Sequence, residues 1–134
     1  MMRFLLALAF ALAVVVACDD ASAPKDPVWG KQACGSCAML VSDPHYAAQL
    51  ATTDGTRVYF DDPGCMAAYI DERHPSVRAI WVKDDAGHWV DAKTARFTRG
   101  AQSPMDYGFA AQTAGTASWA DVEAEAKKRK EGAR

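Results

Sequence analysis

The sequence lacks an excess of positive charge. Its 134 residues include 15 Lys and Arg against 17 Asp and Glu, which gives a formal net charge of -2. The basic cluster at residues 127–130 is typical of the last turn of a helix, where cations interact favourably with the helix dipole. Proteins that bind nucleic acid normally concentrate basic side chains on one face, so we expect no nucleic-acid partner.

The sequence also lacks an apolar run long enough to span a membrane. The run from Phe4 to Ala17 is about 14 residues long, whereas a spanning helix needs roughly 20. With Arg3 before it, this run is typical of an export signal. It ends in Val15-Val16-Ala17-Cys18, which resembles the bacterial lipoprotein signal and implies cleavage before Cys18 and acylation of that residue. An uncleaved anchor or a plain secretory signal is the alternative. Asp19 resembles the signal that retains some lipoproteins in the inner membrane.

Cysteines are few, and their number limits how they can pair in disulfides. The sequence has four, and acylation of Cys18 leaves Cys34, Cys37 and Cys65. Disulfides are the usual state of cysteine outside the cytoplasm, and an odd set leaves at least one thiol without a partner in the chain. Metal ligation is the simplest explanation for that thiol.

Motifs of catalysis are absent as well. The sequence contains no phosphate-binding loop, no dinucleotide-binding motif and no recognisable set of nucleophile and base, so we expect a protein that is not an enzyme. Asp61-Asp62 could suggest a pair of catalytic carboxylates. The following Pro63 favours helix capping instead, because Asp is a preferred N-cap and Pro suits the first helical position.

What the sequence does have is sulfur at short spacing. Cys34-Gly35-Ser36-Cys37-Ala38-Met39 places two thiols and a thioether within six residues. Cys65 falls in the first turn of the helix expected after Asp62, where the amide dipoles favour a thiolate. Met105 lies in a Ser103-Pro104-Met105 turn. Cysteine and methionine sulfurs are the ligands that Cu(I) prefers, so we expect a copper site drawn from Cys34, Cys37, Met39, Cys65 and Met105.

Other readings of these residues stay open. Cys34 and Cys37 could form a structural disulfide or a thioredoxin-type redox pair, although no buried strand precedes them. Cys34, Cys37, Cys65 and His45 could instead hold a structural zinc ion. Cys65, like its neighbour Met66, could be a buried apolar residue.

The pattern of the remaining chain predicts an α+β fold. Helices are expected from Pro63 to Arg73 and from Ser118 onward, where Asp121 completes a capping box. Asp54-Gly55 is a strong signal for a hairpin turn. Alternating side chains and turn signals predict strands at residues 46–52, 57–60, 77–83, 88–91, 97–99 and 107–113. The order is strand, strand, helix, strand, and the second half repeats it without a visible closing strand.

Several blocks of the sequence gain meaning when they are taken in order. They are residues 34–39, Ser42-Asp43, residues 46–49, residues 59–66, Asp91-Ala92 and residues 103–110. Together these blocks resemble the NosL family of accessory lipoproteins of nitrous oxide reductase. Asp106 stands where similar sequences often have glycine.

The resemblance implies two similar strand-strand-helix-strand units in a periplasmic, membrane-anchored Cu(I) chaperone. Such proteins deliver copper to a client enzyme, here expected to be nitrous oxide reductase. The ligands that the family motif implies are Cys34, Cys37, Met39 and Met105. We therefore expect a lipoprotein signal peptide at residues 1–17, a lipid-anchored linker at 18–31 and a NosL-like copper-binding domain at 32–134, on the periplasmic face of the inner membrane.

Overall fold

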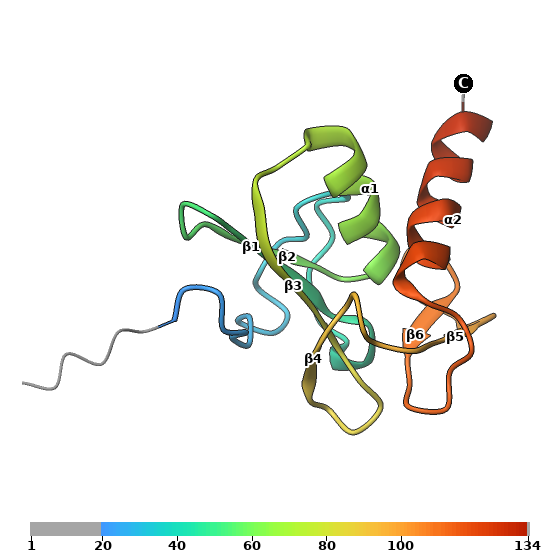
Figure 1. Cartoon of the computed structure of the whole chain (residues 1–134), viewed down its shortest axis with the longest axis horizontal. Coiled ribbons are helices and arrows are strands. Elements are labelled where there is room, and N and C mark those ends of the chain that lie inside the picture. Colours follow the sequence, from blue (N-terminus) through green and yellow to red (C-terminus); the bar gives the residue numbers. More distant parts are fainter. Residues whose placement is uncertain (1–19, 134) are drawn as a thin grey trace, which may run out of the picture.

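The computed structural model describes residues 20–133. A four-stranded antiparallel sheet has the order β2-β1-β3-β4, formed by β1 (Ala48–Thr52), β2 (Arg57–Phe60), β3 (Val77–Lys83) and β4 (Trp89–Asp91). Helix α1 (Pro63–Arg73) connects β2 to β3. The predicted α+β class and the first strand-strand-helix-strand unit are confirmed, with β4 as an added edge strand (Figure 1).

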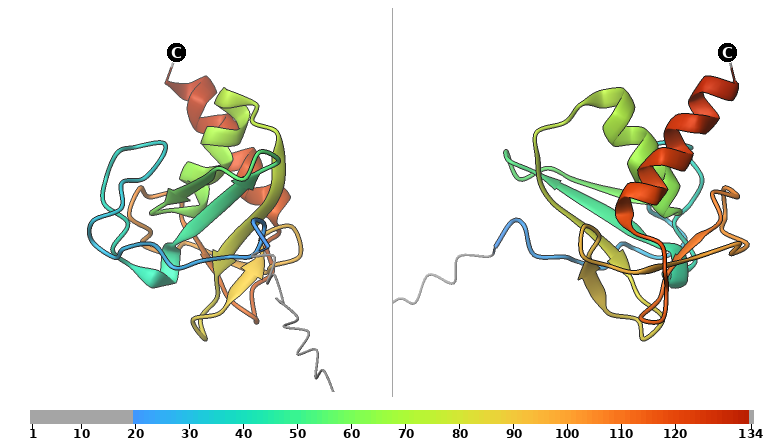
Figure 2. Two further views of the ribbon diagram at one scale, coloured as in Figure 1. Left: turned by 90° about the vertical axis from the view of Figure 1, so that its left-hand side faces the viewer. Right: turned by 45° about the vertical axis from the view of Figure 1, so that its right-hand side comes forward.

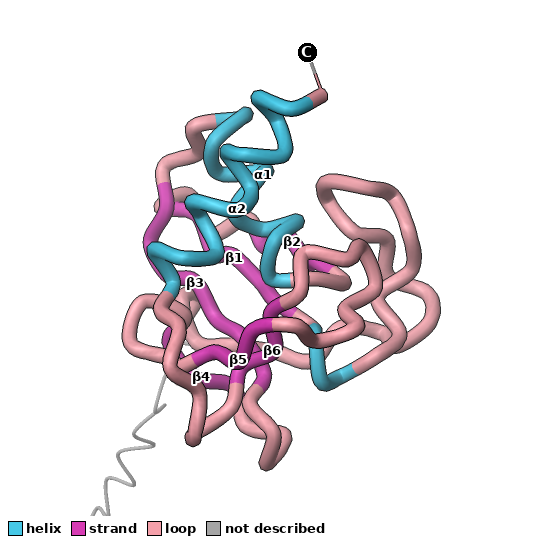
Figure 3. The backbone as a smooth tube through the Cα atoms, turned by 90° about the vertical axis from the view of Figure 1, so that its right-hand side faces the viewer, coloured by secondary structure: helices cyan, strands magenta, loops and turns pink. Residues whose placement is uncertain are grey.

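The second half is smaller. Strands β5 (Phe97–Arg99) and β6 (Phe109–Ala111) form a separate antiparallel pair, and α2 (Trp119–Gly132) follows. Ser118 and Asp121 form the expected capping box at the start of α2. No strand follows α2 within residues 20–133, so the second unit ends with its helix. Helices α1 and α2 lie side by side against the sheets (Figure 3).

One face of the four-stranded sheet forms the apolar core. Leu50, Phe60 and Val82 are fully buried there, and the ring of Phe60 meets that of Tyr69 on α1 at 5.3 Å. In the second half, Phe97 packs against both Phe109 and Trp119, and all three belong to the same buried cluster as the first half. This packing fixes the start of α1 relative to the end of β2.

The other face of the sheet is covered by residues 20–31, which we expected to be a linker. The Arg57 guanidinium donates to the carbonyls of Ala21 and Ala23, and the Trp81 indole donates to that of Ser22. Asp26 accepts from the Trp89 indole at 2.8 Å and pairs with Lys83 at 3.0 Å. The segment crosses the sheet as a strap (Figure 2, left, blue).

The strap changes the burial of β1. We expected side chains of β1 to alternate between core and solvent, yet Gln49 is as buried as Ala48 and Leu50. The Gln49 amide exchanges two hydrogen bonds with the backbone of Lys25, which satisfies it in place of water.

Three strands differ in their bounds from the prediction. Pro44–Tyr46 form a short 3-10 helix, capped by the Asp43 carboxylate, so β1 begins at Ala48 rather than at residue 46. His88 belongs to a turn closed by the Asp84 carboxylate, which delays β4. The last predicted strand shrinks to Phe109–Ala111 because Gly108, at φ +81°, bends the chain just before it.

Candidate metal centre

The Cys34–Met39 segment is a tight loop rather than a helix. The Cys34 N–H donates to the Met39 carbonyl at 2.7 Å, and Ala38 has a left-handed backbone at φ +61°. The Gly35 N–H donates to the Tyr59 carbonyl of β2 at 2.8 Å, which ties the loop to the sheet edge. A side chain at Gly35 would collide with Val58, so this close approach requires glycine.

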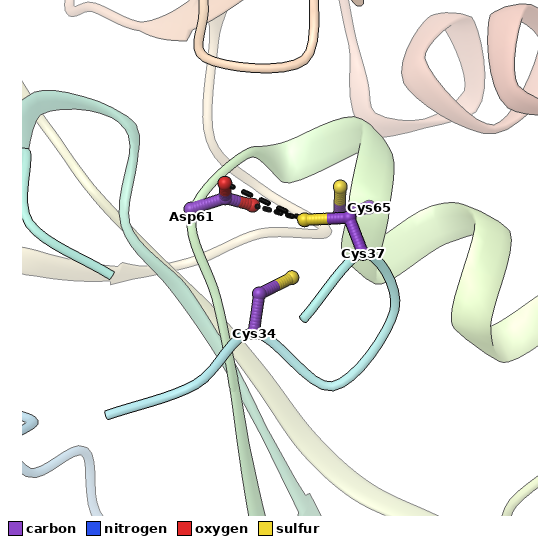
Figure 4. Close-up of side chains that lie close together, drawn as sticks. All are labelled: Cys34, Cys37, Asp61 and Cys65. Carbon is purple, nitrogen blue, oxygen red and sulfur yellow. Dashed lines mark hydrogen bonds between the residues drawn. The ribbon is translucent and has the colours of Figure 1, made fainter. Parts of the chain in front are cut away.

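Helix α1 brings the third thiol to the same place. Asp62 caps the helix by accepting from the Gly64 N–H at 2.8 Å, and Pro63 follows in the first turn. Cys65 therefore faces the loop from the first turn of α1, one residue after Gly64. The sulfurs of Cys34, Cys37 and Cys65 and a carboxylate oxygen of Asp61 all lie within 4.8 Å of one another (Figure 4).

Asp61 is the member of this cluster that sequence reasoning missed. We interpreted Asp61 and Asp62 together as helix capping, which is wrong for Asp61, because only Asp62 caps the helix. The Asp61 carboxylate accepts instead from the Cys37 thiol, with sulfur–oxygen distances of 3.4 and 3.5 Å. One signal in the sequence could have indicated this role. A helix needs only one carboxylate as its N-cap, so the other of two adjacent aspartates is free for another contact.

The cluster is buried on one side and open on the other. Cys34 is 4% exposed, Cys65 is 1% exposed and Asp61 is 3% exposed, whereas Cys37 is partly exposed. All three cysteines are free thiols with no disulfide among them. An incoming atom therefore meets the sulfur of Cys37 first.

The three thiols differ strongly in acidity. The Cys65 thiol donates a hydrogen bond to Cys34, and this lowers the pKa of Cys34 to about 6 against the opposing effect of burial. Backbone N–H groups beside Cys34 act in the same direction. Burial raises the pKa of Cys37 to about 12, and the Cys34 thiolate and Asp61 add to the rise. The shifts therefore leave Cys34 the most acidic of the three thiols.

Cys65 itself departs from expectation. Its place in the first turn of α1 predicted a thiolate, but its pKa is raised. The main cause is its hydrogen bond to the Cys34 thiolate, with burial second. A negative neighbour in contact outweighs the amide dipoles at the helix start, because both thiols cannot ionise at this distance.

The two predicted methionines lie in different surroundings. Met39 is 58% exposed and follows the loop, to which its carbonyl is hydrogen-bonded. Met105 is half-buried against the core, and its N–H donates to the Asp62 carboxylate at 3.0 Å. His45 is exposed and pairs with Asp43, outside the cluster. Cys18 lies outside the described residues.

A solved structure shares this architecture. The crystal structure of the copper chaperone NosL from Shewanella denitrificans matches the chain with a TM-score of 0.60 at 17% identity. The match covers 78% of this chain and 87% of that one. The chain has the NosL fold. The resemblance inferred from the sequence motifs is thereby confirmed at the level of structure.

Two other comparisons are negative. No family model matches the sequence, and no curated protein sequence matches it. Among the described residues, neither helix has the length and apolar character to cross a lipid bilayer.

Proposed function

We propose that this protein is a Cu(I) chaperone that binds copper at the Cys34–Cys37–Cys65 cluster and passes it to a client enzyme by ligand exchange. The observation that carries the proposal is the convergence of three free sulfurs within 4.8 Å in a chain with the fold of a copper chaperone. Soft thiolate ligands select Cu(I), which is stable with as few as two or three of them.

The different burial of the three thiols supports an order in which they would release the metal. Cys34 and Cys65 are held inside the protein, while Cys37 stands at the open side. A ligand of the client would replace Cys37 first, and the two buried sulfurs would release the metal afterwards. The raised pKa of Cys37 and of Cys65 favours the thiol form, so metal binding displaces protons and release is helped when those protons return.

Met39 and Met105 are proposed as additional ligands that take part during capture or release. Met39 is exposed beside Cys37, where a flexible thioether can meet an incoming ion. Met105 belongs to a turn bonded to Asp62, the residue after Asp61. Neither thioether carries a proton, so neither adds a pH-dependent cost to binding.

The same proposal includes the location and the client. The apolar run before Cys18 and the motif that ends at Cys18 support a lipid anchor in the inner membrane, with the domain on its periplasmic side. The sequence blocks that resemble the NosL family support nitrous oxide reductase as the client that we propose. A copper chaperone of this kind transfers metal without catalysing a reaction.

Anaerobic titration of the reduced full chain in detergent, with Cu(I) shared between protein and a chromogenic chelator, tests the proposal. The wild type should compete for a single Cu(I), and the double variant Cys34→Ser/Cys37→Ser should fail to compete. Ser36→Ala is the matched control, because Ser36 lies in the same loop and its side chain is exposed. Full binding by the double variant would exclude this site.

Asp61 gives a second candidate, a structural zinc ion held by three cysteines and one carboxylate. Four such ligands suit tetrahedral Zn²⁺, and carboxylate oxygen is a poor ligand for Cu(I). X-ray absorption on the metal-loaded chain separates the two. Copper bound by sulfur alone supports the chaperone, whereas zinc with a sulfur and oxygen shell, together with unfolding on chelation, supports the structural site.

A thiol–disulfide oxidoreductase is less well supported. Such an enzyme needs an exposed nucleophilic thiolate. Here the acidic thiol is Cys34, which is only 4% exposed, whereas the accessible Cys37 has a raised pKa.

A further inference from the structure

The turn that carries Met105 is bound from the side of α1 by a buried carboxylate. Asp62 is fully buried, and beyond capping α1 it accepts from the Met105 N–H at 3.0 Å and from the Ser103 hydroxyl. The Ser103 oxygen in turn accepts from the Gly108 N–H at 3.0 Å. The turn is therefore connected to the residue that follows Asp61.

The same turn is bound from the opposite side by Arg129 of α2. One guanidinium nitrogen donates to the Met105 carbonyl at 2.9 Å, and another donates to the Asp106 carbonyl. The Nε atom pairs with Glu125 at 3.5 Å. Asp106 has a left-handed backbone at φ +57°, which side chains other than glycine adopt at a cost, so contacts to both carbonyls help to hold this conformation.

Tyr107 joins this arrangement to α1. The Arg129 guanidinium lies 4.4 Å from the centre of the Tyr107 ring, and that ring packs against Gly64. A Cβ atom on Gly64 would fall 1.9 Å from the ring, so the contact is as close as a backbone allows. Gly64 immediately precedes Cys65, so the contacts from Arg129 through Tyr107 reach the residue next to one thiol of the cluster.

We propose that Arg129 is a positioning residue that fixes the Met105 turn beside the start of α1, so that the Met105 thioether can join the copper site. The proposal rests on the proposed function. It assigns a role to the second half of the chain, because Arg129 of α2 fixes the turn that carries Met105.

The variant Arg129→Gln tests this role. It removes the guanidinium fork and the charge over Tyr107, and we expect Cu(I) affinity to fall about 10- to 100-fold, the range typical for loss of a residue that orients a ligand. X-ray absorption should show one sulfur neighbour fewer. Arg129→Lys keeps the charge but cannot bond both carbonyls in a planar fork, so an intermediate loss is expected.

Arg99→Gln is the matched control. Arg99 also pairs with a carboxylate, that of Asp121 at 2.6 Å, and lies over an aromatic ring, that of Phe109 at 5.3 Å. It therefore reproduces the chemistry of Arg129 on β5 without touching the Met105 turn. It should leave Cu(I) affinity unchanged, which separates positioning from a general loss of surface contacts.

A double-variant cycle decides whether Arg129 acts through Met105. If it does, Arg129→Gln should have no further effect on Cu(I) affinity in a Met105→Leu background. Equal losses in both backgrounds, or no loss at all in Arg129→Gln, would overturn the proposal.

Hydrogen exchange of the Met105 amide in the metal-free protein gives a readout that does not depend on copper. Protection of this amide should fall in Arg129→Gln and persist in Arg99→Gln; unchanged protection in Arg129→Gln would also overturn the proposal. Should the wild type fail to bind Cu(I), the proposed function falls, and the exchange result still decides whether Arg129 holds the turn.

Discussion

Replacement of Gly35 by Ala examines how closely the metal loop must approach the sheet. Gly35 has no left-handed backbone angle, so alanine is conformationally allowed there. At such a site Gly→Ala normally stabilises a protein by about 0.4–1 kcal/mol, because it restricts the unfolded chain. The structure predicts the opposite sign, since the new Cβ would lie 2.3 Å from Val58 Cγ1, about 1 Å inside the onset of ordinary contact at 3.4 Å.

The second neighbour of that Cβ, Phe60, cannot easily make room. Phe60 Cε1 lies 3.3 Å from the same position, and Phe60 is fully buried in the core. Overpacking of this kind costs about 1–3 kcal/mol, so we expect Tm of the metal-free protein to fall by about 4 °C or more. The alternative is that the loop lifts off β2 and breaks the Gly35–Tyr59 hydrogen bond, which moves Cys34 and Cys37 away from Cys65.

The affinity for Cu(I) should change if the loop that carries Cys34 and Cys37 moves in this way. Ligand distances in metal sites hold within about 0.2 Å, so a shift of the loop by about 1 Å should lower Cu(I) affinity about tenfold or more. Calorimetry of the metal-free protein and competition against a chelator measure the two effects, with Ser36→Ala as the control. A Gly35→Ala protein with unchanged or higher Tm and wild-type affinity would refute the close approach of the loop to β2.

Three further predictions concern other contacts. Asp62→Asn should lower the free energy of unfolding by about 1–3 kcal/mol in urea titrations, because an amide can cap α1 but faces the Met105 N–H with a second donor; an unchanged value would contradict the shared carboxylate. The pKa of Asp121 is lowered by hydrogen bonds from Ser118, so its contribution to stability should be present above its ordinary pKa and lost as pH falls through the lower folded value. Thermal scans between about pH 5 and pH 2 should show this slope, which should be smaller in Asp121→Asn. Loading with Cu(I) should raise Tm, by the equivalent of about 2.7 kcal/mol when the free ion exceeds Kd about 100-fold, and a strong Cu(I) chelator should reverse the change.

Local signals in the sequence were sufficient for most helices and strands. Asp62-Pro63 predicted the start of α1, and Ser118 with Asp121 predicted that of α2, because capping chemistry acts over a few residues. The Asp54-Gly55 turn correctly joined β1 to β2. These features depend on contacts between near neighbours, which a sequence displays directly.

Features that depend on distant contacts were not predictable in this way. Residues 20–31 are polar and contain two prolines, which is the composition of a linker, yet they cross one face of the sheet and bond to it. The hydrogen-bond acceptors in this segment are mostly backbone carbonyls, so the pattern of side chains in the sequence does not indicate them. The pKa of Cys65 was missed for a similar reason, since it is set by Cys34, a residue 31 positions earlier in the chain.

The identity of the sulfur residues in the sequence did not predict how they are arranged in the site, because residues without sulfur determine that arrangement. Cys34 and Cys37 come from a loop, Asp61 directly follows β2 and Cys65 belongs to α1. Their convergence therefore requires the loop to be tied to β2 and α1 to begin shortly after that strand. The first tie depends on Gly35 and the second on Asp62, and neither residue contributes a sulfur. Asp62 additionally bonds the Met105 turn, so a single buried carboxylate links the start of α1 to the second half of the chain. A change at Asp62 should therefore disturb both groups of sulfurs together, whereas a change at Gly35 should disturb the loop thiols and leave the Met105 turn in place.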